Sequence, residues 1–252
     1  MGDRTGIEWT NATWNPMTGC TKISAGCDHC YAFTLAHTKT RDNYLKHAPV
    51  KDTEANRADP FAPRFWEERL DLPLRWKEPR RIFVNSMSDV FHAQFSLDQI
   101  QAVFGVMATA AWHQFQVLTK RPERALRLAP DLVWPDNVWL GTSIEDMRVA
   151  RRADALREVP AAVRFISAEP LIGPLDELNL DGIHWVIGGG ESGRGHRPCE
   201  LAWARGLRDL CERERVTFFW KQWGGHTPKA GGRELDGRTW DEYPVALPAL
   251  TD

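Results

Sequence analysis

Short apolar runs alternate with amphipathic stretches over residues 81–223. The apolar runs have the length of buried strands and cover residues 81–86, 115–119, 138–142, 163–167, 183–187 and 216–220. Between several of them, apolar residues recur at helical spacing, over 97–111, 143–158 and 200–215. Ser96 and Gln99 form a capping box before the first of these helices, and Ser143 is expected to cap the second. Strands that alternate with helices predict βαβ units and a parallel sheet.

The flanking segments follow other patterns. Two short extended segments are expected within residues 1–19, and a helix is expected from Tyr31 to about Thr40. Residues 41–80 contain five prolines and predict an irregular insertion with a short helix over Arg64–Leu70, and a Gly- and Pro-rich tail begins at about residue 224. No G-x-G-x-x-G follows the first strand, which disfavours a dinucleotide-binding fold. We therefore predict one α/β domain over residues 1–252, a full or partial (β/α) TIM-like barrel of about six to seven parallel strands.

Composition narrows the class of protein. Hydrophobic residues make up 42% and charged residues 26% of the chain, which is typical of a soluble globular protein. The net charge of -2 provides no overall attraction for nucleic acid. The arginines between residues 64 and 81 form either a solvated basic face or a patch for a phosphate-bearing substrate. Without an apolar run of about 18 residues or a signal-peptide pattern, we expect no membrane span and a cytoplasmic location.

Three of the five cysteines, Cys20, Cys27 and Cys30, lie within eleven residues at the spacing C-x6-C-x2-C. Cysteines grouped in this way are usually metal ligands. A structural zinc site takes four protein ligands and would need His29 or His37 as the fourth. A cubane [4Fe–4S] cluster takes one cysteine per iron, so three cysteines leave one iron open. We favour the cluster over zinc, and a disulfide is the least favoured alternative in a reducing compartment.

The other two cysteines lie apart from this group. Cys211 is expected to pack in a helix, whereas Cys199 follows His196, Arg197 and Pro198 and is a candidate second functional thiol.

Polar residues follow nearly every predicted strand. In a barrel of this kind the active site lies at the carboxyl ends of the strands. Alone, each residue has a structural explanation: Glu145 suits a helix N-terminus, and the glycines at 188–190 suit a tight turn. Together they indicate a site, because structural needs do not place polar residues at one end of every strand. The candidates are Ser86, Asp89, Lys120, Arg121, Glu145, Glu169, Gly189, Gly190, Glu191 and Ser192.

Six short strings carry a resemblance to a known family: W-N-P at 14–16, N-S-M-S-D at 85–89, L-T-K-R-P at 118–122, S-A-E-P at 167–170, G-G-E-S-G at 189–193 and K-Q-W-G at 221–224. From about residue 7 to 224 the chain resembles a family of phage and bacterial proteins placed near the radical S-adenosylmethionine (SAM) enzymes and the spore photoproduct lyase-like proteins. Six residues separate Cys20 from Cys27, whereas the main radical SAM pattern is C-x3-C-x2-C. His29 stands where an aromatic residue usually precedes the third cysteine.

The resemblance implies a radical SAM enzyme. Cys20, Cys27 and Cys30 would ligate a [4Fe–4S] cluster, and its open iron would bind the amino and carboxylate groups of SAM. One electron through the cluster would cleave the sulfonium, and the resulting 5′-deoxyadenosyl radical would abstract a substrate hydrogen. An electron donor of the flavodoxin or ferredoxin type is the expected partner. The substrate is open among nucleic acid, nucleotide and peptide.

The resemblance also suggests roles for the strand-end residues. Ser86, Asp89, Glu145 and Glu169 would contact the ammonium or ribose of SAM, Lys120 or Arg121 would meet its carboxylate, and Gly189, Gly190, Glu191 and Ser192 would contact SAM or substrate. The main alternative is a non-catalytic zinc or iron–sulfur protein that binds nucleic acid or a protein partner, and it leaves the polar strand ends unexplained. A second alternative, repair of a DNA photoproduct, rests on analogy of fold.

Overall fold

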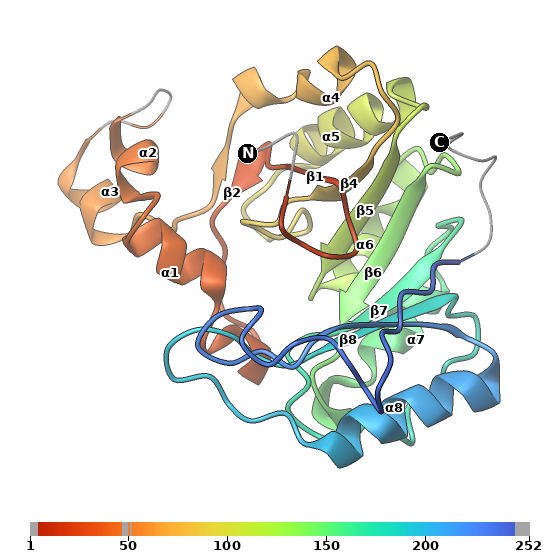
Figure 1. The fold of residues 1–252 in the computed structure, drawn as a ribbon. Helices are drawn as coiled ribbons and strands as arrows, with labels where there is room; N and C mark the ends of the chain where they lie inside the picture. Colours follow the sequence, from red (N-terminus) through yellow and green to blue (C-terminus); the bar gives the residue numbers. More distant parts are fainter. Residues whose placement is uncertain (1–4, 47–49, 51, 245–252) are drawn as a thin grey trace.

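A computed structural model describes residues 5–46, 50 and 52–244 of the chain. Seven strands form one sheet in which every neighbouring pair is parallel (Figure 1). In spatial order they are β1 (Ala12–Trp14), β4 (Arg81–Val84), β5 (Gln114–Thr119), β6 (Val138–Ser143), β7 (Arg164–Ala168), β8 (Trp185–Gly189) and β9 (Thr217–Gln222). The spatial order repeats the chain order, so the sheet curls into a half-barrel instead of reversing direction as a doubly wound sheet does. The predicted partial TIM-like barrel is confirmed.

Four helices that follow strands β4, β5, β6 and β8 cover the outer, convex face of this sheet (Figure 1). They are α5 (Leu97–Thr109), α6 (Pro122–Leu128), α7 (Arg152–Arg157) and α8 (Leu201–Glu214). Alternate strand residues such as Ile82, Val117 and Leu140 are fully buried in the core beneath them. The predicted capping box is present at the start of α5, where the Gln99 N–H donates to Ser96 Oγ at 3.2 Å.

The concave face is filled by a second core of aromatic residues. Trp9, Phe83, Trp139, Phe165 and Trp185 belong to this cluster, and the rings of Trp9 and Phe83 lie 4.7 Å apart. Toward the carboxyl ends of the same strands, the inward positions change to small residues, namely Gly141, Ser143, Ser167 and Gly189. Bulky aromatic residues therefore close the amino-terminal half of the concave face, and small side chains line the half next to the strand ends.

Gly141 shows how tightly this face is packed. A Cβ atom on Gly141 would lie 2.3 Å from the Phe165 ring. We expect Gly141→Ala to lower the free energy of unfolding by about 1–3 kcal/mol, the usual cost of overpacking. Gly105 in α5 is the control, because a Cβ there meets no atom within 4 Å and alanine should stabilise the helix by about 0.5–1 kcal/mol. Urea unfolding of both variants tests this, and equal effects would contradict it.

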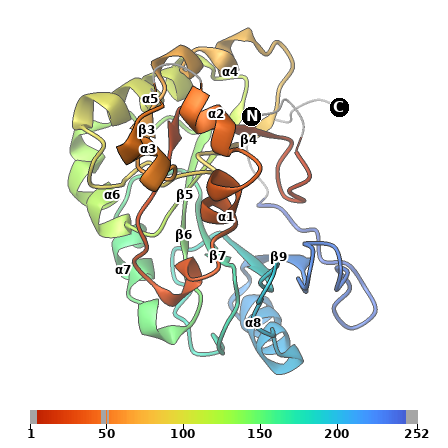
Figure 2. The ribbon, with the colours of Figure 1, turned by 90° about the vertical axis from the view of Figure 1, so that its left-hand side faces the viewer.

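The segment between β1 and β4 carries short elements. Two-residue strands β2 (Met17–Thr18) and β3 (Arg64–Phe65) pair antiparallel, and the helices are α1 (Tyr31–His37), α2 (Arg41–Lys46), α3 (Glu54–Ala58) and α4 (Leu72–Arg75). The helix predicted over Arg64–Leu70 is wrong, because its first two residues pair with β2 and only Glu67–Arg69 form a single 3-10 turn. Figure 2 shows α1 to α3 in front of the sheet when the molecule is viewed from the side where these helices lie.

Other boundaries also move. Ser143 does not cap a helix but ends β6, because it pairs with Ser167 of β7. Asp146 caps the 3-10 turn Met147–Val149 instead, and α7 follows it. The strand predicted at 183–187 begins two residues later, at Trp185.

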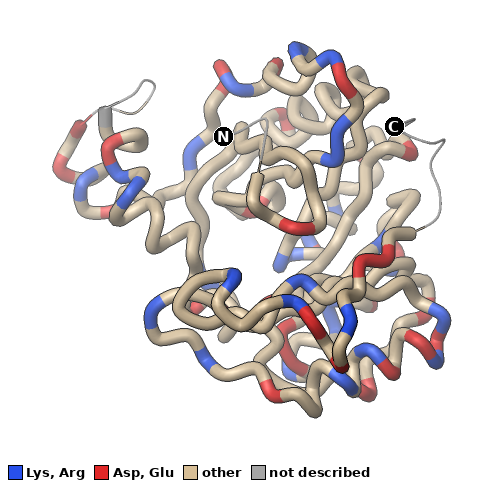
Figure 3. Tube along the Cα trace, viewed as in Figure 1, with Lys and Arg blue, Asp and Glu red and all other residues tan. Residues whose placement is uncertain are grey.

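No helix in the described part of the chain is both long enough and apolar enough to cross a membrane. In the view of Figure 3, acidic and basic positions are interspersed along α8 instead of being separated by sign.

Candidate functional site

The first cysteine of the loop is held against the turn after β4. Gly19 pairs with Ser88, whose hydroxyl donates to the Gly19 carbonyl at 2.6 Å. Gly19 has a φ of +84°, and a Cβ there would lie 2.1 Å from the Ala62 carbonyl oxygen, so only glycine fits. Cys20 is thereby placed at the carboxyl edge of the sheet.

The second and third cysteines lie over the ends of β6 and β4. Cys27 ends the 3-10 turn Ala25–Cys27, and a Cβ on Gly26 would lie 2.4 Å from the Glu145 side chain. Cys30 is the residue before α1, and the hydroxyl of the next residue, Tyr31, donates to the Ser86 carbonyl. The Ser86 hydroxyl in turn donates to Asn15 Oδ1 at 3.2 Å. The three cysteines therefore sit above the ends of two strands, β4 and β6, that are distant in sequence.

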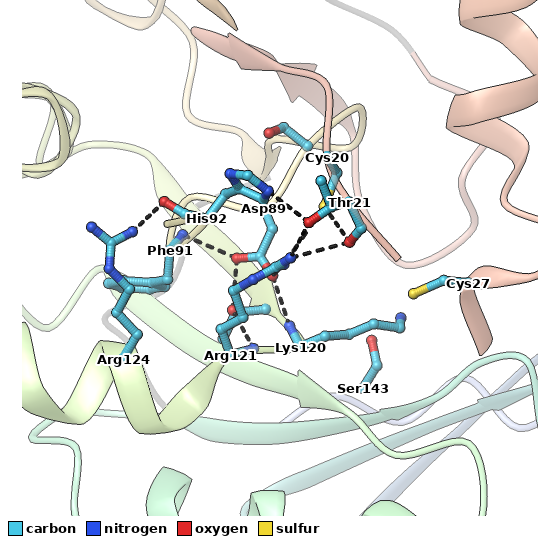
Figure 4. Close-up of polar contacts among 12 residues, drawn as sticks. Cys20, Thr21, Cys27, Asp89, Phe91, His92, Lys120, Arg121, Arg124 and Ser143 are labelled. Atoms are coloured by element: carbon cyan, nitrogen blue, oxygen red, sulfur yellow. Dashed lines mark hydrogen bonds and ion pairs between the residues drawn. The ribbon is translucent and has the colours of Figure 1, made fainter. Parts of the chain in front are cut away.

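Asp89 is the centre of a polar network below Cys20 (Figure 4). Its carboxylate accepts hydrogen bonds from the Phe91 N–H at 3.0 Å, Thr119 Oγ1 at 2.7 Å and the Lys120 N–H at 3.0 Å, and it pairs with Arg121 at 2.8 Å. A carboxylate has about four lone-pair sites, so these partners fill the acceptor capacity of Asp89.

Cys20 and His92 lie beside this network. Burial and the nearby Asp89 carboxylate raise the pKa of Cys20 to about 11, against an opposing effect of Arg121, 3.6 Å from its sulfur. Burial, followed by the Arg121 cation, lowers the pKa of His92, so its ring is neutral. Its Nδ1 accepts from the Gln94 N–H, and its Nε2–H donates to Thr21 Oγ1 at 2.9 Å.

Glu145 is buried beneath Cys27 with two cations. It is 1% exposed, pairs with Arg152 at 3.1 Å and with Lys120 at 3.3 Å, and accepts from Ser24 Oγ at 3.0 Å. Arg152 also donates to the Ser143 carbonyl at 2.8 Å. A buried carboxylate needs such compensation, because desolvation of an unpaired charge is costly. Glu145 thus joins the cysteine loop to the end of β6.

Glu191 makes the corresponding link to the loop after β8. Arg197 donates to it from the backbone N–H at 2.8 Å and from its guanidinium at 2.5 and 3.0 Å, and the His29 ring is 2.8 Å away. Arg197 also donates to the Ala25 carbonyl at 2.9 Å. Burial alone would raise the pKa of Glu191, but the hydrogen bonds from Arg197 and His29 outweigh it and lower this pKa to about 2.

This depressed pKa predicts a pH dependence of stability. The folded state holds Glu191 ionised below its ordinary pKa of 4.5, so the stabilisation is complete above about pH 4.5 and is lost as the pH falls toward about 2. It amounts to about 3 kcal/mol at neutral pH. We expect urea unfolding to show Glu191→Gln less stable than wild type by about this amount at pH 7, with a gap that narrows from pH 5 to pH 3. A gap independent of pH would contradict the assignment.

Glu169 differs from the other three carboxylates. Among the described residues, its hydrogen-bond and ion-pair partners are Ser167 Oγ at 3.3 Å and Lys221 Nζ at 2.7 Å. Ser167 and Glu169 belong to β7 and its end, and Lys221 belongs to β9, so their side chains meet across Gly189 at the end of the intervening β8. Glu169 therefore has lone pairs left for further hydrogen bonds, whereas protein donors occupy those of Asp89, Glu145 and Glu191. The Lys221 ammonium likewise has N–H donors left.

The remaining candidates after β8 are held by backbone contacts. The Gly190 N–H donates to the Gln222 carbonyl at 2.8 Å, and a Cβ on Gly190 would lie 2.0 Å from the Trp223 carbonyl oxygen. Ser192 pairs with Gly225 in an isolated bridge. These contacts join the loop after β8 to the segment after β9.

The two other cysteines differ in burial. Cys211 is fully buried in α8, as predicted. Cys199 is half-buried beside Gly190, and burial raises its pKa to about 12. A thiol with a raised pKa is a poor nucleophile at neutral pH.

The cysteine loop offers three thiols as donors. Within residues 5–46, 50 and 52–244, no three His, Cys, Asp or Glu side chains converge on a point where one metal ion would bind. The two histidines considered as fourth zinc ligands have other partners: His29 is paired with Glu191, and His37 contacts the Phe33 carbonyl at 2.9 Å. Three half-buried free thiols on one loop fit a cubane cluster, in which each cysteine binds a different iron.

The basic segment at 64–81 is engaged by the protein itself. Arg64 donates to the carbonyls of Pro60 and Ala62, Arg69 stacks 3.8 Å from the Trp66 ring, and Arg75 pairs with Asp71 at 2.6 Å. These contacts favour a structural use of the arginines over a phosphate patch.

Several residues of the site were not found from the sequence. In the cysteine loop, Ser24 donates to Glu145 and Thr21 accepts from Arg121. Outside the loop, Arg152 donates to Glu145 and Arg197 donates to the Ala25 carbonyl. Arg152 alone gave a usable signal, because it lies four residues before the buried Leu156 and thus on the apolar side of α7. The others make contacts across the fold that local spacing does not reveal.

The family described as "Protein of unknown function (DUF5131)" matches residues 4–244. No curated protein sequence matches the chain. A point mutant of spore photoproduct lyase has a similar structure, with a TM-score of 0.51 at 13% identity over 83% of this chain and 75% of that one. Spore photoproduct lyase complexed with dinucleoside spore photoproduct gives a TM-score of 0.47 at 14% identity, over 81% of this chain and 60% of that one. At these identities the likeness concerns the fold.

Proposed function

We propose that the chain is a radical SAM-type enzyme that uses a [4Fe–4S] cluster on Cys20, Cys27 and Cys30. It belongs to the family described as "Protein of unknown function (DUF5131)". The observation that carries the proposal is the position of three half-buried thiols over the strand ends of a half-barrel. The same edge of the sheet carries the ion pair of Glu169 and Lys221, which has hydrogen-bonding capacity left for a ligand. The fold shared with spore photoproduct lyase, itself a radical SAM enzyme, supports it.

The cluster, when bound, would supply reductive cleavage of SAM and with it the radical that removes a substrate hydrogen. The chain would provide one thiolate for each of three irons. A set of three cysteine ligands would leave one iron open to the amino acid end of SAM.

Glu169 and Lys221 would contact SAM directly. The Lys221 ammonium, 2.7 Å from Glu169, suits a carboxylate, and the free lone pairs of Glu169 suit an ammonium or a ribose hydroxyl. Ser86 and the backbone at Gly189 and Gly190 would complete the surface around the ligand. Asp89, Glu145 and Glu191 would instead position the loops, since protein donors fill their oxygens.

The aromatic residues of the concave face would protect a radical from solvent. Trp139, Phe165 and Trp185 are each at most 2% exposed and close the amino-terminal half of that face. Exclusion of water limits side reactions of reactive species. A small electron-transfer protein of the flavodoxin or ferredoxin type would provide the electron, and the substrate would bind above the small residues at the strand ends.

Anaerobic reconstitution with iron and sulfide, followed by EPR of the reduced protein with and without SAM, tests the proposal. We expect a [4Fe–4S] signal that changes when SAM is added. Stoichiometric zinc with no iron uptake, or a cluster whose signal is indifferent to SAM, would overturn it and favour a metal-stabilised binding protein.

A further inference from the structure

Two consecutive residues after β5 hold the two ends of the long loop between Cys20 and Cys27. The Arg121 guanidinium lies 3.6 Å from Cys20 Sγ and donates to the carbonyl and hydroxyl oxygens of Thr21 at 3.1 Å. Lys120 pairs with Glu145 at 3.3 Å, and Glu145 accepts from Ser24, whose hydroxyl is 3.9 Å from Cys27 Sγ. Figure 4 shows Arg121 directed to Cys20 and Thr21, and Lys120 extended in the direction of Cys27.

The Arg121 side chain is held in place by Asp89. The Asp89 carboxylate pairs with its Nη1 at 2.8 Å, and Asp89 is itself held by Thr119 Oγ1 and the Lys120 N–H. The Arg121 N–H also donates to Thr119 Oγ1 at 2.9 Å. With Nη1 shared by Asp89 and Cys20 and Nη2 bound to Thr21, the guanidinium is used within the protein and is poorly placed to receive the carboxylate of SAM.

We propose that Arg121 is a positioning residue that fixes Cys20 and donates a hydrogen bond to its sulfur, and that it thereby raises the reduction potential of the cluster. This inference rests on the proposed function. Hydrogen bonds and charge at the sulfur ligands set the potentials of iron–sulfur clusters. Reduction adds negative charge to the cluster, so a fixed cation at one thiolate favours the reduced form.

The positioning role of Arg121 matters because the spacing between the first two cysteines is long. Six residues separate Cys20 from Cys27, and a loop of that length has more conformations to restrict than a shorter one. Arg121 restricts its beginning at Thr21, and the Lys120–Glu145–Ser24 chain restricts its end.

The first measurement is the midpoint potential of the reconstituted cluster in wild type, Arg121→Gln, Arg121→Lys and Arg124→Gln. Arg124 is a matched control three residues further along, in α6, where it donates to the carbonyls of His92 and Phe95 instead of a cysteine. For Arg121→Gln we expect the equilibrium constant of one-electron reduction to fall tenfold, which corresponds to a midpoint potential about 59 mV more negative than that of wild type. Arg121→Lys should recover part of the shift, and Arg124→Gln should match wild type.

The second measurement uses the metal-free protein, so that it does not depend on the cluster. Hydrogen–deuterium exchange of residues 19–24 should be faster in Arg121→Gln than in wild type and unchanged in Arg124→Gln. Faster exchange with an unaltered potential would overturn the donor role. Unaltered exchange would overturn the positioning role, whether or not a cluster forms. If Arg121→Gln exchanges faster than wild type as expected, but the protein takes up no iron, the proposed function is overturned, and with it any role of Arg121 toward a cluster.

Discussion

Replacement of Cys20, Cys27 or Cys30 with alanine is expected to abolish the iron–sulfur absorbance of the reconstituted protein and its cleavage of SAM. In the proposed cluster each thiol would bind a different iron, so the loss of one would remove a coordination bond that no neighbouring residue replaces. The loss of activity should exceed about 100-fold, because even an outer partner of a metal ligand costs 10–100-fold. Visible absorbance, iron content and anaerobic formation of 5′-deoxyadenosine measure the effect.

The other two cysteines provide the controls for this experiment. Cys211 is fully buried in α8, and Cys199 lies beside Gly190. Cys211→Ala and Cys199→Ala should keep the cluster absorbance, and Cys211→Ala should lose some stability through the space left in the core. An intact cluster in all three alanine variants of the loop would rule out the ligand assignment.

Arg152→Met is expected to lower the free energy of unfolding by about 3–5 kcal/mol, although the exchange keeps much of the side-chain volume. Arg152 is 5% exposed and pairs with Glu145, which is 1% exposed. Removal of one partner leaves a buried carboxylate with less compensation, which is the costly way to disrupt a buried pair. Urea unfolding monitored by tryptophan fluorescence measures the change.

A nearby pair is the matched control for this experiment. Arg148 pairs with Asp146 at 2.5 Å, but its side chain is 73% exposed, so Arg148→Met should cost less than about 1 kcal/mol. The double variant Glu145→Gln with Arg152→Met should recover part of the stability, because it removes the buried charge as well as its partner. Equal losses at Arg148 and Arg152 would show that burial is not the cause.

The cysteine and Arg152 experiments test two parts of the same site, the ligands and the residues that support them. The cysteine variants test the ligands themselves, whereas Arg152→Met tests the support beneath Cys27, which reaches the loop through Glu145 and Ser24. A supported loop is necessary for a precise site, since ligands must be held by residues whose own positions are locked. If the proposed function is correct, Arg152→Met should lower cluster retention as well as stability.

The sequence alone was sufficient for the class of fold, and it predicted that polar residues meet at the carboxyl edge of the sheet. Each strand is a local apolar run, and runs that alternate with helical segments have few topologies other than a parallel sheet. Parallel strands bring their carboxyl ends to one edge, so the polar residues after each run, including Asp89, Glu145 and Glu169, were expected to meet there. The cysteine spacing is likewise local information.

Tertiary structure decided which of those residues are free to act. Ser24 and Glu145 are 121 residues apart in the chain, and His29 and Glu191 are 162 apart; no local pattern indicates such contacts. Their pairing fills the oxygens of Asp89, Glu145 and Glu191 and leaves Glu169 with Lys221. The physical reason is that burial and competition for hydrogen bonds depend on which strand ends become neighbours, whereas residue type and spacing set only the chemistry available at each end.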